Sequence, residues 1–207
     1  IDNGSKQEIL VSSYVCHPSM ANDSLSGVVT AVYLYKIIKS NPEYFRSYNI
    51  RFVFAPETIG SIVYLCNNKN MVKDRTHSGL VLTCLGDKGG FNYKRTFFGD
   101  NLIDNIAEYI LNHYSNDYQV RDYCPTGSDE RQYGSPGFRM PVGVLTRSMF
   151  GEFPEYHTSK DNLSFIKPEY LAESLYLISL IFAVINMNKI YSRVNPFCEP
   201  QMSKYDL

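Results

Sequence analysis

A chain of 207 residues with 44% hydrophobic and 20% charged residues is long enough to bury one core and has an ordinary globular composition. The formal net charge of −1, without a basic block, gives no reason to expect a nucleic-acid partner or an anionic membrane surface. The five cysteines form no C-x-x-C pair, which argues against a disulfide framework or a thiolate zinc site and favours a reducing, cytoplasmic compartment.

Runs of strand length alternate with helical patterns along the chain. β-Branched and apolar runs predict strands, whereas apolar residues spaced three and four apart predict helices. The longest apolar run, 175–184, is shorter than the ~20 residues of a membrane span and indicates a buried helix. The predicted order is strand 8–15, helix 25–38, strand 49–55, helix 58–67, strand 79–85, strand 90–97, helix 100–114, strand 141–146 and helix 168–190.

This alternation predicts an α/β fold, a three-layer sandwich with a mostly parallel central sheet. We expect residues 1–190 to form one catalytic domain and 191–207 to be a C-terminal extension that leads to a further part of a longer protein. Strand 90–97 is expected to be more exposed than the others, because polar and aromatic residues alternate along it, and Asp100 is the expected cap of the helix that follows. The loops 122–140 and 147–162 are long and rich in Gly, Pro and charge, so we expect them to carry function.

Metal-capable side chains follow three successive strands. His17, Glu57 and Asp87 each come two residues after a predicted strand. In an open parallel sheet the carboxyl ends of the strands line one crevice, and ligands bind there. A single carboxylate or histidine in such a place is usually a helix cap or a solvated residue, but three in one crevice favour a site.

Two further residues fit the same site. Asp23 follows His17 by six residues and precedes a helix, where an acidic side chain both caps the helix and stays ionised. His157 lies on a polar loop after the last strand, where a core role is hard to explain. Imidazole and carboxylate ligands without sulfur suit Zn²⁺ or a similar divalent ion. Such an ion needs a general base beside its water, and Glu57 is the candidate.

Five short motifs, given below in chain order, resemble the co-catalytic zinc aminopeptidase superfamily, and the resemblance extends over residues 8 to about 190. The amino-acid sequences of these motifs are similar to those in the aminopeptidase-like domain of bacterial polysaccharide-biosynthesis proteins. The motifs are His17-Pro-Ser-Met-Ala-Asn-Asp23, Pro56-Glu57-Thr-Ile-Gly-Ser61, Leu85-Gly-Asp87, Gly127-Ser-Asp-Glu-Arg-Gln-Tyr133 and Glu155-Tyr-His-Thr-Ser159.

The resemblance implies a zinc-aminopeptidase-like catalytic domain with one or two zinc ions. Asp23 would bridge two ions, His17 and Asp87 would complete the shell of one, and His157 would bind the other.

The superfamily has a Glu-Glu pair, base then ligand, where this chain has one glutamate. Either Glu57 matches the base and Thr58 replaces the ligand, or Pro56 replaces the base and Glu57 is the ligand. A second departure is Ser19, which stands where the superfamily has the Asp that orients the histidine.

The 122–140 loop brings a polar cluster to a position that lines the site in relatives. We expect Asp129, Glu130 and Arg131 to bind substrate, with Glu130 as a further candidate ligand or base and Arg131 able to hold a carboxylate or an oxyanion. A solvated, salt-bridged loop is the alternative. Tyr156 is a candidate donor to an oxyanion, with an aromatic core role as the alternative.

The function predicted is hydrolysis of an amide bond by a metal-activated water, with Glu57 as general base. The substrate is a peptide N-terminus or another small amide, such as one on an amino sugar. The alternative is a degenerate hydrolase fold that serves as a metal-bound binding or regulatory module in polysaccharide biosynthesis. A serine α/β-hydrolase is excluded, because no G-x-S-x-G elbow is present. A homo-oligomer is left open.

Overall fold

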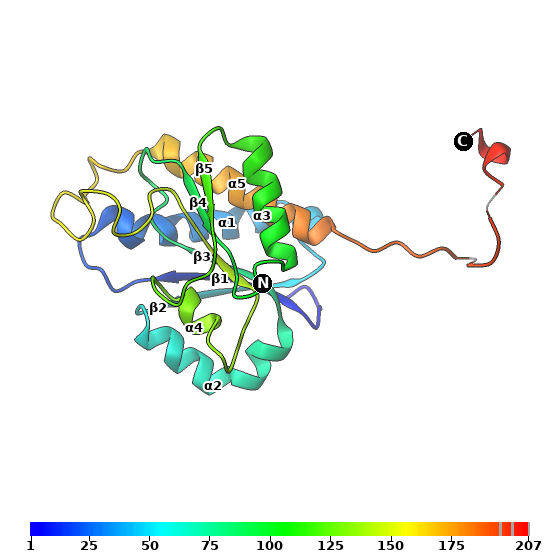
Figure 1. The fold of residues 1–207 in the computed structure, drawn as a ribbon, viewed down its shortest axis with the longest axis horizontal. Helices are drawn as coiled ribbons and strands as arrows, with labels where there is room; N and C mark the ends of the chain where they lie inside the picture. Colours follow the sequence, from blue (N-terminus) through cyan, green and yellow to red (C-terminus); the bar gives the residue numbers. More distant parts are fainter. Residues whose placement is uncertain (195, 200, 207) are drawn as a thin grey trace.

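A computed structural model describes residues 1–194, 196–199 and 201–206 and contains one six-stranded mixed sheet (Figure 1). The strand order across the sheet is β2-β1-β3-β6-β4-β5, in which the first four strands are parallel and β4 is antiparallel to β6. The strands are β1 (Glu8–Tyr14), β2 (Asn49–Ala55), β3 (Thr76–Leu82), β4 (Phe91–Lys94), β5 (Tyr118–Arg121) and β6 (Val142–Thr146).

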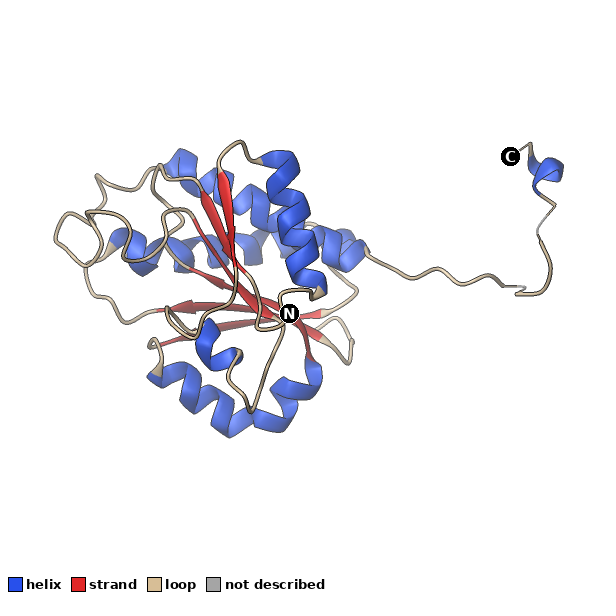
Figure 2. Ribbon diagram, in the orientation of Figure 1, coloured by secondary structure: helices blue, strands red, loops and turns tan. Residues whose placement is uncertain are grey.

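Helices cover both faces of the sheet, as Figure 2 shows. The helices α1 (Gly27–Ser40), α3 (Leu102–Tyr114) and α5 (Pro168–Met187) pack on one face and share one hydrophobic core. The helices α2 (Ile59–Arg75) and α4 (Glu130–Tyr133) cover the other face over a second core. The predicted three-layer α/β sandwich with a mostly parallel sheet is therefore confirmed. Three short helical segments complete the fold: the π-helical turn η1 (Ala21–Ser26) and the 3-10 helices η2 (Pro42–Tyr44) and η3 (Met202–Tyr205).

The helix α5 is apolar enough, by length and composition alone, to cross a membrane. In this fold it lies on the sheet beside α1 and α3, and its buried face belongs to the larger core. The predicted buried helix at this place is thus present, and it ends at Met187. The described residues that follow run away from the body of the domain (Figure 1).

Several predicted boundaries need correction. The strand predicted at 79–85 is β3, which ends at Leu82, so three more residues belong to the loop that follows. The strand predicted at 90–97 is the shorter β4, and it is fully buried instead of exposed. Its polar residues find buried partners: Asn92 donates to the Arg147 carbonyl at 2.6 Å, and Lys94 pairs with Glu130.

The helix predicted from residue 100 begins at Leu102 and is capped by Asn101 instead of Asp100. The Asn101 side chain and Asp104 form a reciprocal capping box. The helix predicted to end near 67 has a non-helical residue at Asn68 but continues to Arg75. The strand β5 and the helix α4 were not predicted at all.

The parallel strands place the candidate site. The carboxyl ends of β1, β2 and β3 lie at the same edge of the sheet, and the segments that follow them carry His17, Glu57 and Thr83. The turn η1 leads from β1 into α1 at this edge and carries Asp23.

Candidate metal centre

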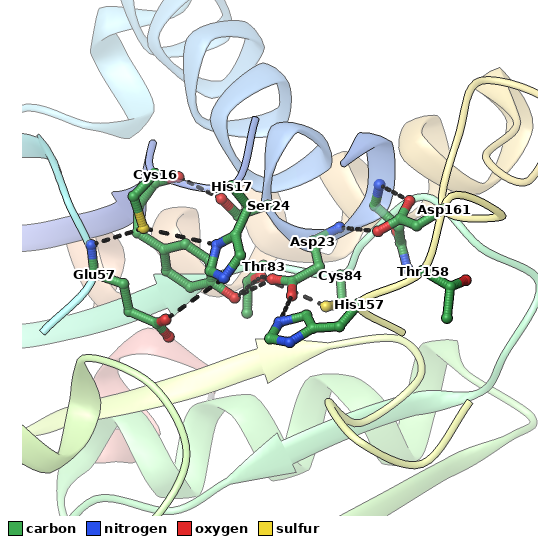
Figure 3. Close-up of polar contacts among 12 residues, drawn as sticks. Cys16, His17, Asp23, Ser24, Glu57, Thr83, Cys84, His157, Thr158 and Asp161 are labelled. Atoms are coloured by element: carbon green, nitrogen blue, oxygen red, sulfur yellow. Dashed lines mark hydrogen bonds and ion pairs between the residues drawn. The ribbon is translucent and has the colours of Figure 1, made fainter. Parts of the chain in front are cut away.

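Two histidines and one aspartate meet at the carboxyl edge of the sheet. The ligand atoms of His17, Asp23 and His157 all lie within 4.8 Å of one another (Figure 3). The His157 Nε2 lies 3.0 Å from Asp23 Oδ2, and the centroids of the two imidazole rings are 5.0 Å apart. The structure therefore brings together three of the predicted ligands, contributed by segments that are far apart in the sequence.

This donor set fits a divalent metal ion. With bonds of about 2.0–2.1 Å, neighbouring ligand atoms of a tetrahedral zinc ion are about 3.3 Å apart, close to the separation of His157 and Asp23. Two imidazoles and one carboxylate are a known catalytic zinc set that keeps a coordination position open. Asp23 is fully buried, whereas the His157 side chain is 49% exposed, so one side of the cluster faces solvent.

Asp161 holds the backbone of the Asp23 turn. Its buried carboxylate accepts the Asn22 N–H at 2.6 Å. It also accepts the Asp23 N–H at 2.9 Å (Figure 3). Because Asp161 follows His157 by four residues, one loop supplies both a ligand and the group that positions its partner. The sequence patterns gave no role to Asp161.

Tyr14 holds the other end of the same carboxylate. Its buried hydroxyl donates to Asp23 Oδ1 and lies 2.7 Å from Thr83 Oγ1. Burial raises the pKa of Tyr14 well above its ordinary value, and the nearby Asp23 charge adds to the effect. Tyr14 is therefore a neutral donor at physiological pH. The sequence offered no signal for this role, because Tyr14 is one of 17 tyrosines.

Glu57 lies beside the cluster. Its Oε2 is 3.9 Å from His17 Nε2, and its backbone N–H is 3.1 Å from Cys16 Sγ. Burial raises the pKa of the Glu57 carboxyl above its ordinary value. Cys16, His17 and Glu57 form a second group of close ligand atoms, which shares His17 with the first. Glu57 thus lies next to His17, and its role as base or as ligand stays a prediction.

The structure does not bring Asp87 into either group of ligands. The Asp87 side chain is buried, and its oxygens accept hydrogen bonds from Asn22 Nδ2 at 2.7 Å, the Gly89 N–H at 2.7 Å and Ser148 Oγ at 2.6 Å. Since β3 ends at Leu82, the side chain that faces Asp23 after this strand is Thr83. Asp87 fixes the loops around the site in place.

The predicted substrate residues divide between two environments. Asp129 accepts the Thr58 N–H at 2.7 Å, and Arg131 Nη2 donates to Thr58 Oγ1 at 2.8 Å, so both hold the segment directly after Glu57. Glu130 is instead fully buried and pairs with Lys94 at 2.7 Å. The geometry makes Glu130 part of an internal ion pair and not a ligand of the cluster.

Tyr156 lies on the open side of the cluster. Its ring stacks on the His157 imidazole with centroids 4.0 Å apart and an angle of 12° between the planes. Burial raises the pKa of Tyr156 to about 12, so its hydroxyl is a proton donor at neutral pH. His157 itself has a left-handed backbone φ of 54°, a conformation of the kind that functional sites often retain.

Comparisons with known proteins agree with this architecture. A family model described as "Domain of unknown function (DUF4910)" matches residues 1–188. A candidate polysaccharide biosynthesis protein with an aminopeptidase-like domain from Clostridium acetobutylicum is 47% identical over 199 residues, covering 96% of this chain and 45% of the relative. A crystal structure of a candidate peptidase from the same species has a TM-score of 0.84 at 47% identity, covering 96% of this chain and 46% of that one.

More distant structures share the fold. An aminopeptidase from Aneurinibacillus sp. strain AM-1 has a TM-score of 0.69 at 20% identity, over 88% of this chain and 44% of that one. A zinc aminopeptidase from Bacillus subtilis has a TM-score of 0.71 at 18% identity, over 90% of this chain and 48% of that one. The predicted resemblance to an aminopeptidase-like domain is thereby confirmed. The chain spans less than half the length of these relatives.

Proposed function

This chain belongs to the DUF4910 family, and from that premise we propose that it is a metal-dependent hydrolase that cleaves amide bonds. The observation that carries the proposal is the group formed by His17, Asp23 and His157, with the Glu57 carboxylate beside it. These three residues would hold the ion, and zinc is the first candidate because the donors are imidazole and carboxylate. When bound, such an ion polarises a carbonyl and lowers the pKa of a water molecule.

The protein groups around the cluster supply the proton chemistry. A carboxylate whose pKa is raised by burial is a better acceptor near neutral pH, and Glu57 has this property next to the ligand His17. We assign Glu57 the role of taking a proton from the attacking water and passing it to the leaving amine. Tyr156, protonated and stacked on His157, is positioned to donate to a developing oxyanion.

The first candidate substrate is a peptide with a free N-terminus, as the aminopeptidase names of the structural neighbours suggest. An amide on an amino sugar is the second, suggested by the name of the Clostridium relative. We place the activity in a reducing compartment such as the cytoplasm, since all five cysteines are free and four of them are exposed.

Metal content and turnover, measured on the same preparations, test this function. We expect zinc to be bound and to be lost in Asp23→Ala, whereas Glu57→Gln keeps the ion but loses turnover of aminoacyl anilides or N-acyl amino sugars. His113→Ala, which removes an exposed histidine on α3, is the matched control and should change neither. A protein that takes up no metal would exclude the proposed mechanism.

A second candidate function is a metal-bound binding or regulatory module. One observation favours it: Thr58, directly after Glu57, is held by Asp129 and Arg131 through hydrogen bonds and adds no acidic ligand. This module would bind zinc with the same residues but show no turnover of any amide. The two functions are therefore separated by the activity of the zinc-loaded protein.

A further inference from the structure

The two oxygens of the Asp23 carboxylate have different surroundings. Oδ2 faces the imidazole of His157 at 3.0 Å, on the side of the ligand group. Oδ1 accepts a hydrogen bond from the hydroxyl of Tyr14. Thr83 Oγ1 lies 3.5 Å from the same oxygen, and Figure 3 shows Thr83 beside Asp23. One oxygen is thus available to a metal ion, while the other has a protein donor.

A carboxylate that bridges a pair of metal ions about 3.5–4 Å apart commonly gives one oxygen to each ion, and each ion needs further ligands on its own side. On the Oδ1 side of Asp23 the structure offers hydroxyl groups. The oxygens of Tyr14 and Thr83 lie 2.7 Å apart, and both side chains are buried. Neutral hydroxyl donors satisfy a carboxylate oxygen but do not replace an anionic ligand, so this side lacks the charge that a second ion needs.

Among the residues that the structure describes, the ligand group that contains Asp23 has no second carboxylate. Asp87, the acidic residue nearest the end of β3, is fixed by donors from Asn22, Gly89 and Ser148 and is not in the ligand group. Glu57 lies beside His17 in the second ligand group, with Cys16, and not in the group that contains Asp23, whose other members are His17 and His157.

We infer that the centre holds one divalent ion and not a bridged pair, because Tyr14 and Thr83 occupy the side of Asp23 where a second ion would bind. Asp23 is then a terminal ligand through Oδ2, and its Oδ1 is oriented by the Tyr14 hydroxyl. The inference rests on the proposed metal site, but it concerns the number of ions and not the reaction.

Zinc stoichiometry by equilibrium dialysis and elemental analysis tests the inference without any activity assay. The number of ions is the difference between the wild type and Asp23→Ala, which removes the ligand that both ions of a pair would share and so corrects for zinc on exposed thiols. We expect a difference of one ion per chain. Two ions would overturn the inference while leaving the metallohydrolase intact, and no ion in either protein would overturn both.

A designed variant tests the cause. Tyr14→Phe together with Thr83→Asp removes the hydroxyl from Oδ1 and adds a carboxylate beside it, so we expect this protein to bind two ions. Tyr14→Phe alone should still bind one. A double variant that folds, as judged by far-UV circular dichroism, and still binds one ion would overturn the assignment to Tyr14 and Thr83. If the double variant does not fold, the wild-type stoichiometry decides the question alone.

Discussion

The buried ion pair between Lys94 and Glu130 makes a strong prediction about stability. The Lys94 side chain is 3% exposed and that of Glu130 is fully buried, with Nζ and Oε1 2.7 Å apart. Lys94→Met removes the cation, and Glu130 Oε2, which has no hydrogen-bond partner among the described residues, offers no compensation. Breaking a buried pair in this way costs about 3–5 kcal/mol, a large share of the ~5–15 kcal/mol that stabilises a typical domain.

The loss should depend on pH in a defined direction. Burial raises the pKa of the Glu130 carboxyl, and Lys94 opposes that rise, so Lys94→Met raises the pKa further. A carboxyl group whose pKa is higher in the folded than in the unfolded state contributes fully to stability below its unfolded-state pKa, which is about 4.3 for Glu. This contribution is lost as the pH rises through the folded-state pKa. The deficit of the variant should therefore be small near pH 4 and largest near neutrality.

Urea unfolding followed by circular dichroism between pH 4 and 8 measures both effects. Lys94→Met combined with Glu130→Gln removes both charges and should recover most of the stability at neutral pH, with little pH dependence relative to the wild type. A loss below about 1 kcal/mol at pH 7, or an equal loss at pH 4 and pH 7, would refute the assignment of these residues as an internal pair.

Three further changes probe other parts of the domain. Asp161→Asn places an amide against one of the two N–H groups that the carboxylate holds, and we expect about 2–4 kcal/mol of destabilisation by denaturant unfolding and about 10–100-fold weaker zinc binding by calorimetry. The Thr126 hydroxyl lowers the pKa of the exposed Cys124 thiol, so its alkylation by iodoacetamide, followed by mass spectrometry, should reach half-maximal rate at a lower pH than in Thr126→Val. Gly27→Ala brings a Cβ to 2.1 Å from the last carbonyl of β3 and should destabilise the protein by about 1–3 kcal/mol, whereas Gly137→Ala, whose Cβ would have no atom of the described residues within 4 Å, should not.

Each of these expectations has a result that contradicts it. Asp161→Asn with wild-type stability and zinc affinity would mean that the backbone of Asn22 and Asp23 holds its place without the carboxylate. Equal alkylation profiles for the wild type and Thr126→Val would remove the hydroxyl as the cause of the altered pKa. Equal melting temperatures for Gly27→Ala and Gly137→Ala would show that α1 can move away from β3 at little cost.

The sequence predicted the layers of the fold because its apolar periodicities are long and regular. Where the prediction was wrong, the deciding partner was distant in the sequence. Lys94 was expected on an exposed strand, but its partner Glu130 lies 36 residues away and lets β4 be buried. The helix predicted to end at residue 67 has a non-helical residue at Asn68, yet α2 continues for about two further turns to Arg75.

The candidate site was predictable to the extent that it depends on strand ends. His17 and Glu57 follow β1 and β2 closely, so the meeting of their side chains required only a parallel sheet. The end of β3 was placed three residues too late, which drew attention to Asp87 and away from Thr83. Tyr14 escaped notice because an aromatic residue inside a strand is ordinary, and its hydroxyl bond to Asp23 is visible only in three dimensions.

The carboxylate of Asp161 also has a consequence for the order in which the protein folds and opens. Its hydrogen bonds to the amides of Asn22 and Asp23 span 139 and 138 residues, so they form only after the sheet has brought both segments together. We therefore expect the same two amides to exchange with solvent when this one contact opens, without unfolding of the strands beneath. Their hydrogen-exchange rates therefore report the local opening of the site separately from the stability of the domain.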